Sequence, residues 1–160
     1  MFKVSFKENP QFPVKKVQRF NDDRVTVVTL KGITQVPVFL QYYIPPKIFE
    51  WTNTLKNVDV EFGMSKMFIT VTGKSICSKE DKIDRVLGDR IAEARAKIAL
   101  YRFMELLCKK MYIFYKGIVD GKSDIMLNVA NEHDCLYNSY LKYGMLHDRE
   151  KQHLKDLMNS

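Results

Sequence analysis

The sequence predicts a single α+β domain over residues 1–160, in which a small antiparallel β-sheet is covered by a long helix that continues into a C-terminal helical hairpin. Three observations favour this class. Residues 1–77 carry β-branched runs bounded by turn residues, residues 78–120 switch to helical spacing, and residues 123–158 repeat that spacing after a glycine-containing connection. A length of 160 residues fits one core rather than two.

The composition is that of a folded protein with a basic balance. Lys and Arg total 26 against 19 Asp and Glu, a net charge of +7, and 46% of the residues are hydrophobic. This apolar share excludes wholesale disorder. No apolar run approaches the roughly 18 residues of a membrane span, and the N-terminus lacks the apolar block of a signal peptide. We therefore expect a soluble, cytoplasmic protein without a membrane partner.

Two strands joined as a hairpin are expected first. The run 24–31 has the β-branched density of a strand, and Gly32-Ile33 would connect it to a second strand over 34–43. Pro37 cannot donate to a ladder, which places this second strand at a sheet edge or a bulge. Residues 9–23 look the least structured.

A short helix and a third strand follow. Pro46 suits the first turn of a helix reaching Leu55. The run 66–77 reads as a strand, in which alternation puts Met67 and Phe68 on opposite faces.

The long helix is predicted to begin between Ser78 and Asp84, which are two N-cap candidates. No Gly or Pro occurs between Arg90 and Lys116, so we expect one continuous helix, although its apolar stripe changes side near Ala99. The early stripe is expected to cover the sheet and the late stripe to meet another helix. The early stripe comprises Ile83, Leu87, Ile91, Ala94 and Ile98, and the late one Leu100, Phe103, Leu107, Met111, Phe114 and Ile118.

Small side chains form a ridge on the same helix. At close to four-residue spacing they would let the helix approach its neighbour closely. Gly117 and Gly121 predict a stop, after which a helix over 123–158 would form an antiparallel hairpin with the first. The ridge comprises Gly88, Ala92, Ala96 and Ala99.

One segment resembles a known motif. The run from Gly73 to Asp84, continuing through Gly88, Ile91-Ala92 and Arg95-Ala96, is similar to a unit in short bacteriophage and prophage proteins, mostly of unassigned function. A similar strand-to-helix unit occurs in small domains with a double-stranded-RNA-binding-domain-like (dsRBD-like) topology. The resemblance covers about residues 67–98. It implies a dsRBD-like core, a phage origin and the cytoplasm of the host cell, but no activity.

Basic side chains supply a candidate nucleic-acid surface, because cations near one another attract phosphates. Exposed aromatics such as Tyr42, Tyr43 or Trp51 would stack on unpaired bases. Alternatively these cations solvate a helix face and pair with Asp89 and Glu93. The candidates are Lys15, Lys16, Arg19, Lys74, Lys79, Arg90, Arg95 and Lys97. For Arg95 we expect a structural ion pair with Asp81, Asp84 or Asp89.

Aromatic side chains of the two helices supply a candidate protein interface. They surround too much of the first helix for burial on one side, which indicates either packing on several sides within the monomer or contact with a partner or a second copy. The eight methionines of the chain suit an adaptable contact surface. The candidates are Tyr101, Tyr112, Phe114, Tyr115 and Tyr137.

Catalytic and metal-binding patterns are weak. Cys77, Cys108 and Cys135 are an odd number at wide spacing, which predicts reduced, mostly buried thiols. Cys77 precedes a helix, but all three histidines lie in the C-terminal region, and His133 and Cys135 would point in different directions for a metal. No glycine-rich phosphate loop or nucleophile elbow occurs. We expect no enzyme, cofactor or metal.

The sequence therefore favours a non-enzymatic phage accessory protein that acts by binding. The leading hypothesis is a host-takeover or anti-defence inhibitor of a host protein complex. The alternatives are a small basic nucleic-acid-binding protein, in contact with DNA or RNA, and a structural or cargo protein of the virion. The expected partner is a host or phage protein, and formation of a homo-oligomer is a further alternative.

Overall fold

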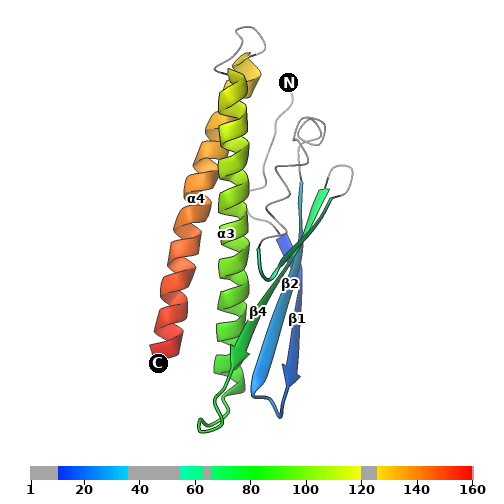
Figure 1. Cartoon of the computed structure of the whole chain (residues 1–160), viewed down its shortest axis with the longest axis vertical. Helices are drawn as coiled ribbons and strands as arrows, with labels where there is room; N and C mark the ends of the chain where they lie inside the picture. Colours follow the sequence, from blue (N-terminus) through cyan, green and yellow to red (C-terminus); the bar gives the residue numbers. More distant parts are fainter. Residues whose placement is uncertain (1–10, 36–54, 63–65, 120–125, 160) are drawn as a thin grey trace.

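A computed structural model describes residues 11–35, 55–62, 66–119 and 126–159. Helix α3 lies between the sheet and α4, so these residues form three layers (Figure 1). The predicted class is confirmed as an α+β protein with an antiparallel sheet, a long helix and a C-terminal helix. In chain order the elements are β1 (Gln11–Phe20), β2 (Val25–Gln35), β3 (Val58–Phe62), β4 (Lys66–Ile76), α3 (Arg85–Val119) and α4 (Met126–Asn159).

The sheet has four antiparallel strands in the order β1-β2-β4-β3. Its strands alternate between a face that packs on α3 and a face turned away from it. In β4, Met67 is buried while Phe68 is 40% exposed, which confirms the predicted alternation. The buried face contributes Val28 and Leu30 of β2 and Ile69 and Val71 of β4 to the core.

The predicted hairpin at Gly32-Ile33 is wrong. Strand β2 runs through both residues to Gln35, and its partners at this point are Ile69 and Phe68 of β4. The glycine lies inside a strand that is paired over this stretch, and the pairing across the sheet outweighs its local preference for a turn. The remainder of the expected strand 34–43, with Pro37, lies outside the described residues.

The expectation for residues 9–23 is also wrong from Gln11 onward. Residues Gln11–Phe20 form the edge strand β1, joined to β2 by the turn from Asn21 to Arg24, which is closed by a 3.1 Å hydrogen bond between their backbones. Two of the β1 side chains that face α3, Lys15 and Arg19, are cations on either side of Val17, so apolar alternation did not reveal the strand. The short strand β3 was likewise not predicted, and the expected helix from Pro46 lies outside the described residues except for Leu55.

Helix α3 begins after Asp84, the second of the two cap candidates. Its Oδ1 accepts a 2.9 Å hydrogen bond from the backbone N–H of Leu87. Ser78 instead donates to Asp81, at 2.7 Å, in the preceding loop. The helix then continues for 35 residues, which confirms the predicted continuity.

The ridge of small side chains brings α3 close to the sheet. A Cβ added at Gly73 would lie 1.9 Å from the carbonyl oxygen of Ala92 and 2.4 Å from the backbone nitrogen of Ala96. Gly88 lies over Thr26, with 3.3 Å between the position of an added Cβ and the threonine Oγ1. Close approach through the ridge is therefore confirmed.

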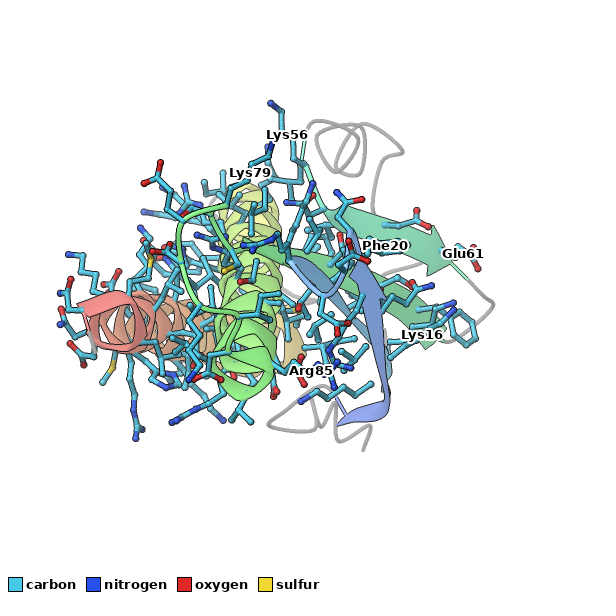
Figure 2. The ribbon with its side chains drawn as sticks, turned by 90° about the horizontal axis from the view of Figure 1, so that it is seen from below. Lys16, Phe20, Lys56, Glu61, Lys79 and Arg85 are labelled. Carbon is cyan, nitrogen blue, oxygen red and sulfur yellow. The ribbon has the colours of Figure 1, made fainter. Side chains whose placement is uncertain are left out.

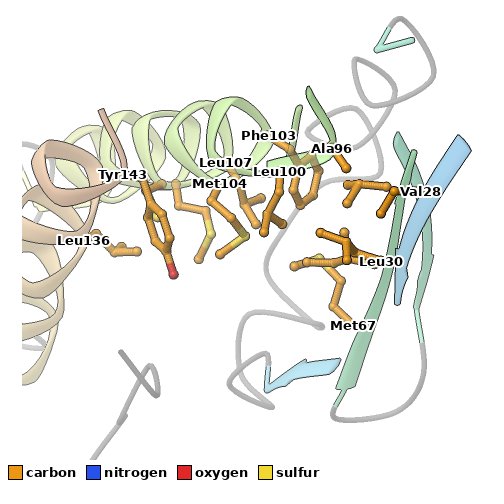
Figure 3. Packing of buried hydrophobic residues seen from close by; sticks show 14 of the residues in the cluster. Val28, Leu30, Met67, Ala96, Leu100, Phe103, Met104, Leu107, Leu136 and Tyr143 are labelled. Atoms are coloured by element: carbon orange, nitrogen blue, oxygen red, sulfur yellow. The ribbon is translucent and has the colours of Figure 1, made fainter. Parts of the chain in front are cut away.

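The expected division of α3 into an early sheet-facing half and a late helix-facing half is wrong. Phe103 follows Ala96 by two turns, so it continues the ridge on the sheet side, where it packs near Val28 (Figure 3). Ala94, from the early stripe, precedes Tyr101 by two turns and shares its side, toward α4. The face of α3 that contacts the sheet begins with glycine and alanine, which are weakly hydrophobic. The expected stripes followed the larger apolar side chains and therefore missed this face.

Helix α4 runs antiparallel to α3, as predicted. Leu136, Tyr143 and Leu157 are buried, and Leu136 and Tyr143 belong to the core (Figure 3). Gly144 lies beside Glu105 of α3. Among the described residues, neither helix contains a stretch apolar enough to cross a membrane.

Candidate interaction surfaces

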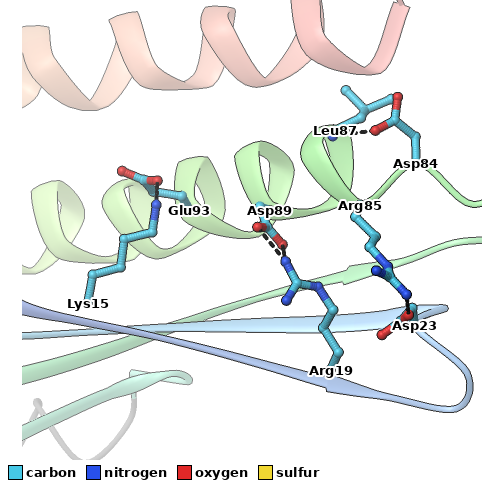
Figure 4. A network of polar contacts seen from close by, with 8 residues as sticks. All are labelled: Lys15, Arg19, Asp23, Asp84, Arg85, Leu87, Asp89 and Glu93. Carbon is cyan, nitrogen blue, oxygen red and sulfur yellow. Dashed lines mark hydrogen bonds and ion pairs between the residues drawn. The ribbon is translucent and has the colours of Figure 1, made fainter.

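Ion pairs join β1 to the first half of α3. Lys15 pairs with Glu93, and Arg19 binds both carboxylate oxygens of Asp89 at 2.6 and 2.8 Å (Figure 4). Lys97 reaches Glu93 from one turn further along α3, at 3.0 Å. Burial alone would raise the pKa of the Glu93 carboxyl, but hydrogen bonds from Lys15 and Lys97 hold that pKa below its usual value. These three cations are therefore engaged in ion pairs with the carboxylates of α3.

Arg85 forms a further ion pair with Asp23, in the turn between β1 and β2 (Figure 4). We call this row of ion pairs between α3 and the β1–β2 hairpin the seam. Asn21, Asp22 and Asp23 of that turn all have positive φ, between 52° and 66°. Asn and Asp tolerate this left-handed region better than most residues. The turn and the start of α3 border an open depression whose lining includes the acidic residues Asp22, Asp23 and Asp84 and the basic residues Lys82 and Arg85.

Arg95 does not have the expected carboxylate partner. Its Nη1 donates a 2.6 Å hydrogen bond to the backbone carbonyl of Lys74. Strand β3 pairs with β4 only as far as Val71, so this carbonyl lies beyond the paired part of the edge. Arg95 thus has the expected structural role, but its partner is a strand carbonyl rather than a carboxylate.

The eight basic candidates do not form one surface. Lys15, Arg19 and Lys97 lie in the seam, and Arg95 lies against β4. Lys79 and Arg90 are exposed in the loop before α3 and in its second turn. Lys16 and Lys74 lie on a different face of the molecule.

This face is the side of the sheet turned away from α3, which we call the open sheet face. Lys15 and Arg19 reach α3, so the alternate β1 residues Lys16 and Phe20 point the other way. Figure 2 shows Lys16 and Glu61 on the side away from the helices. The exposed or partly exposed residues that characterise the face are Lys16 and Phe20 of β1, Val25 and Lys31 of β2, Phe68, Lys74 and Ile76 of β4, and Asp59 and Glu61 of β3.

The aromatic candidates divide in a similar way. Tyr112 of α3 and Tyr137 of α4 have ring centroids 5.3 Å apart, and Tyr137 lies 6.4 Å from Tyr140. Tyr101 is half-buried between the helices, where burial, followed by the charge of Glu150, raises its pKa. The side chains of Phe114 and Tyr115 lie outside the described residues.

Exposed apolar side chains continue from this cluster along α4. Tyr137, Leu141 and Met145 follow one another at four-residue spacing and are 43%, 45% and 74% exposed. The stripe moves from the flank of α4 toward the side opposite α3. We call these three residues the α4 stripe; sequence patterning singled out only Tyr137, because Leu141 and Met145 were indistinguishable from core positions.

The thiols and imidazoles show no catalytic arrangement within the described residues. Burial raises the pKa of the Cys108 thiol to about 12, so this residue stays a neutral core side chain. Burial, followed by the charge of Lys151, lowers the pKa of His147 between the helices. The side chains of His133 and Cys135 are not described, and the described residues contain no group of three potential metal ligands.

The described residues thus define a three-layer α+β protein with two exposed outer faces, the open sheet face and the α4 stripe. Comparison with protein-family models, with curated proteins and with solved structures found no match to this chain.

Proposed function

We propose that the protein acts by binding a partner protein through the α4 stripe, without catalysis of its own. The observation that supports this proposal is the exposure of Tyr137, Leu141 and Met145 in one row on a helix whose opposite side is already packed. A helix that buries one side and leaves large apolar groups on another is typical of an interaction surface.

The composition of the stripe suits a protein partner. Tyrosine supplies a large contact area at low entropic cost and is enriched at the energetically important positions of interfaces. The neighbouring rings of Tyr112 and Tyr140 restrict the orientations of Tyr137. Met145, the most exposed of the three, adapts its shape readily to an apolar pocket.

The resemblance of residues 67–98 to phage proteins suggests the setting. We propose a host-takeover or anti-defence factor that inhibits a host protein complex in the host cytoplasm, with the sheet and α3 as a dsRBD-like core. A structural or cargo role in the virion uses the same surface against a phage protein. Mass spectrometry of purified virions separates the two roles, because only the second leaves the protein in the particle.

Site-specific photo-crosslinking tests the docking surface. A photoreactive amino acid at position 145 is expected to trap one protein in nuclease-treated lysate of the host, whereas the same group at Lys155, exposed near the end of α4, is not. Leu141→Glu is expected to reduce recovery of that protein at least tenfold, because it places a charge in an apolar contact.

The matched control is Lys155→Gln, which lowers the net charge by the same one unit on the same helix. It is expected to leave recovery unchanged. Both positions are exposed, so both variants are expected to keep the circular dichroism spectrum of the parent protein. Equal recovery with Leu141→Glu and the parent protein would contradict docking through the α4 stripe.

A further inference from the structure

We propose that the open sheet face binds single-stranded nucleic acid. This site lies on the other outer layer from the α4 stripe and does not depend on the proposed protein partner. Two properties of the face carry the proposal: three exposed lysines on neighbouring strands that form no ion pair with the described residues, and aromatic side chains exposed at both ends.

The strand register places one lysine in each of three successive rows. Lys74 stands opposite Val27, Lys16 stands opposite Thr29, and Lys31 lies in the next row of β2. Successive rows on one face are roughly 7 Å apart, because two residues of a strand separate them. The three lysines lie on three neighbouring strands, with Lys31 on β2 between Lys16 on β1 and Lys74 on β4, so Lys16 and Lys74 are separated by roughly 10 Å across the sheet as well as by one row along it. Lysine side chains are long and flexible, so a single strand that crosses the sheet obliquely can contact all three ammonium groups.

These lysines are available, unlike the cations of the seam. Lys16, Lys31 and Lys74 are exposed, and within the described part of the chain none of them forms an ion pair. Lys15 and Arg19, on the other side of the same strand, are paired with α3. The fold thus neutralises Lys15 and Arg19 on the inner face, whereas the three outer lysines have no acidic partner among the described residues, which gives the outer face charge complementarity to a phosphate backbone.

Aromatic groups mark the two ends of the lysine rows. Phe20, 50% exposed, forms an apolar row with Val25 and Ile76, which is the most exposed of the three. Phe68 lies two strands away at the opposite end, paired with Ile33. Exposed rings on a sheet stack on bases, and only unpaired bases offer their faces for this. Single strands are therefore favoured over duplexes.

Acidic side chains set one boundary of the site. Asp59 and Glu61 lie on the edge strand β3, and Glu61 stands opposite Phe68. Their charge would repel phosphates, so the bound strand is expected to follow β1, β2 and β4. Removing one charge by Glu61→Gln is expected to strengthen binding slightly.

Fluorescence anisotropy with labelled oligo-dT and oligo-U of about 12 nucleotides tests the proposal, a length within the ~4–16 nucleotides that single-strand sites of OB folds span. The full chain is expected to bind these probes more tightly than a duplex of equal length. Phe20→Ala is expected to weaken binding about tenfold through lost stacking, and Phe20→Tyr is expected to preserve it.

The charge contribution is measured by titrating at salt concentrations from roughly 50 to 200 mM. Replacing Lys16, Lys31 and Lys74 together by Gln is expected to lower the slope of log affinity against log salt by about 2, since each phosphate contact on a single strand contributes ~0.7. The control replaces three exposed lysines of the helices by Gln, at equal cost in net charge, and is expected to leave the slope unchanged. These control positions are Lys109, Lys151 and Lys155.

Three results would overturn the proposal. The first is no binding of either probe at the lowest salt. The second is an equal loss in the sheet and helix triple variants, which would show attraction by net charge alone. The third is that Phe20→Ala and the sheet triple variant bind nucleic acid as the parent protein does but no longer capture a partner protein. That result would make this face a protein-binding surface. All substituted side chains are exposed, and circular dichroism verifies that the variants fold.

Discussion

Gly73 shows how one missing side chain sets the distance between two layers. Its position in β4 lies directly beneath the backbone of Ala92 and Ala96, closer than a Cβ atom tolerates. The neighbouring atoms belong to helix backbone, which cannot rotate away as a flexible side chain does. The contact between α3 and the sheet therefore depends on glycine at this position and on alanine opposite it.

Gly73→Ala is accordingly expected to lower the free energy of unfolding by about 3 kcal/mol, because α3 must move away from β4. Urea denaturation followed by circular dichroism measures the change. Gly144→Ala is the matched control: its added Cβ would lie 3.6 Å from the Glu105 side chain, an ordinary contact, and it replaces a glycine inside α4. That variant is expected to gain up to ~1 kcal/mol. An equal change in the free energy of unfolding for the two variants would contradict the close approach of α3 to Gly73.

At the scale of elements, β1 is held to α3 by charge as well as by backbone pairing with β2. The edge position of β1 means that it has one strand neighbour, and its helix-facing side carries Lys15 and Arg19 around Val17. Their carboxylate partners on α3 are partly exposed, so each pair contributes little alone. Both pairs join the same edge strand to α3.

The pH dependence of the seam has a definite sign. The folded-state pKa of Glu93 is lowered, so this carboxylate contributes stability above its unfolded pKa, near 4.5, and that contribution is lost as the pH falls through the folded value. Glu93→Gln is expected to cost less than ~1 kcal/mol at pH 7 and nothing at about pH 3. Urea denaturation at the two pH values measures this.

Glu61→Gln, on the exposed edge strand β3, is the control and is expected to leave the free energy of unfolding unchanged at pH 7. A loss with Glu93→Gln that stays constant, or grows, toward acid pH would exclude the ion pairs as its cause.

At the scale of the whole molecule, features with local causes were predictable from the sequence. The N-cap at Asp84, the unbroken α3 and the ridge at Gly88 and Ala92 each depend on a few neighbouring residues, and the structure has all of them. Strand β1 and the passage of β2 through Gly32 depend on pairing across the sheet, which local preferences do not reveal.

Whether a candidate surface residue is exposed also depends on pairing and packing between elements. Lys15 and Lys16 are neighbours in sequence, but alternation sends them to opposite faces, so a cluster of basic letters could not separate paired from free cations. Leu141 and Met145 have core-like identities, and only the position of α3 shows that they are exposed. A side chain's availability is a property of the assembled layers.

Docking through α4 is tested most directly by immobilising the full chain and measuring how much of the proposed partner protein it retains after nuclease treatment, as salt is raised from roughly 50 to 200 mM. An apolar contact centred on Leu141 and Met145 predicts undiminished retention by the parent protein and loss with Leu141→Glu at every salt concentration. Release of the protein by salt or nuclease, or its full retention by Leu141→Glu, would contradict that surface as the site of binding.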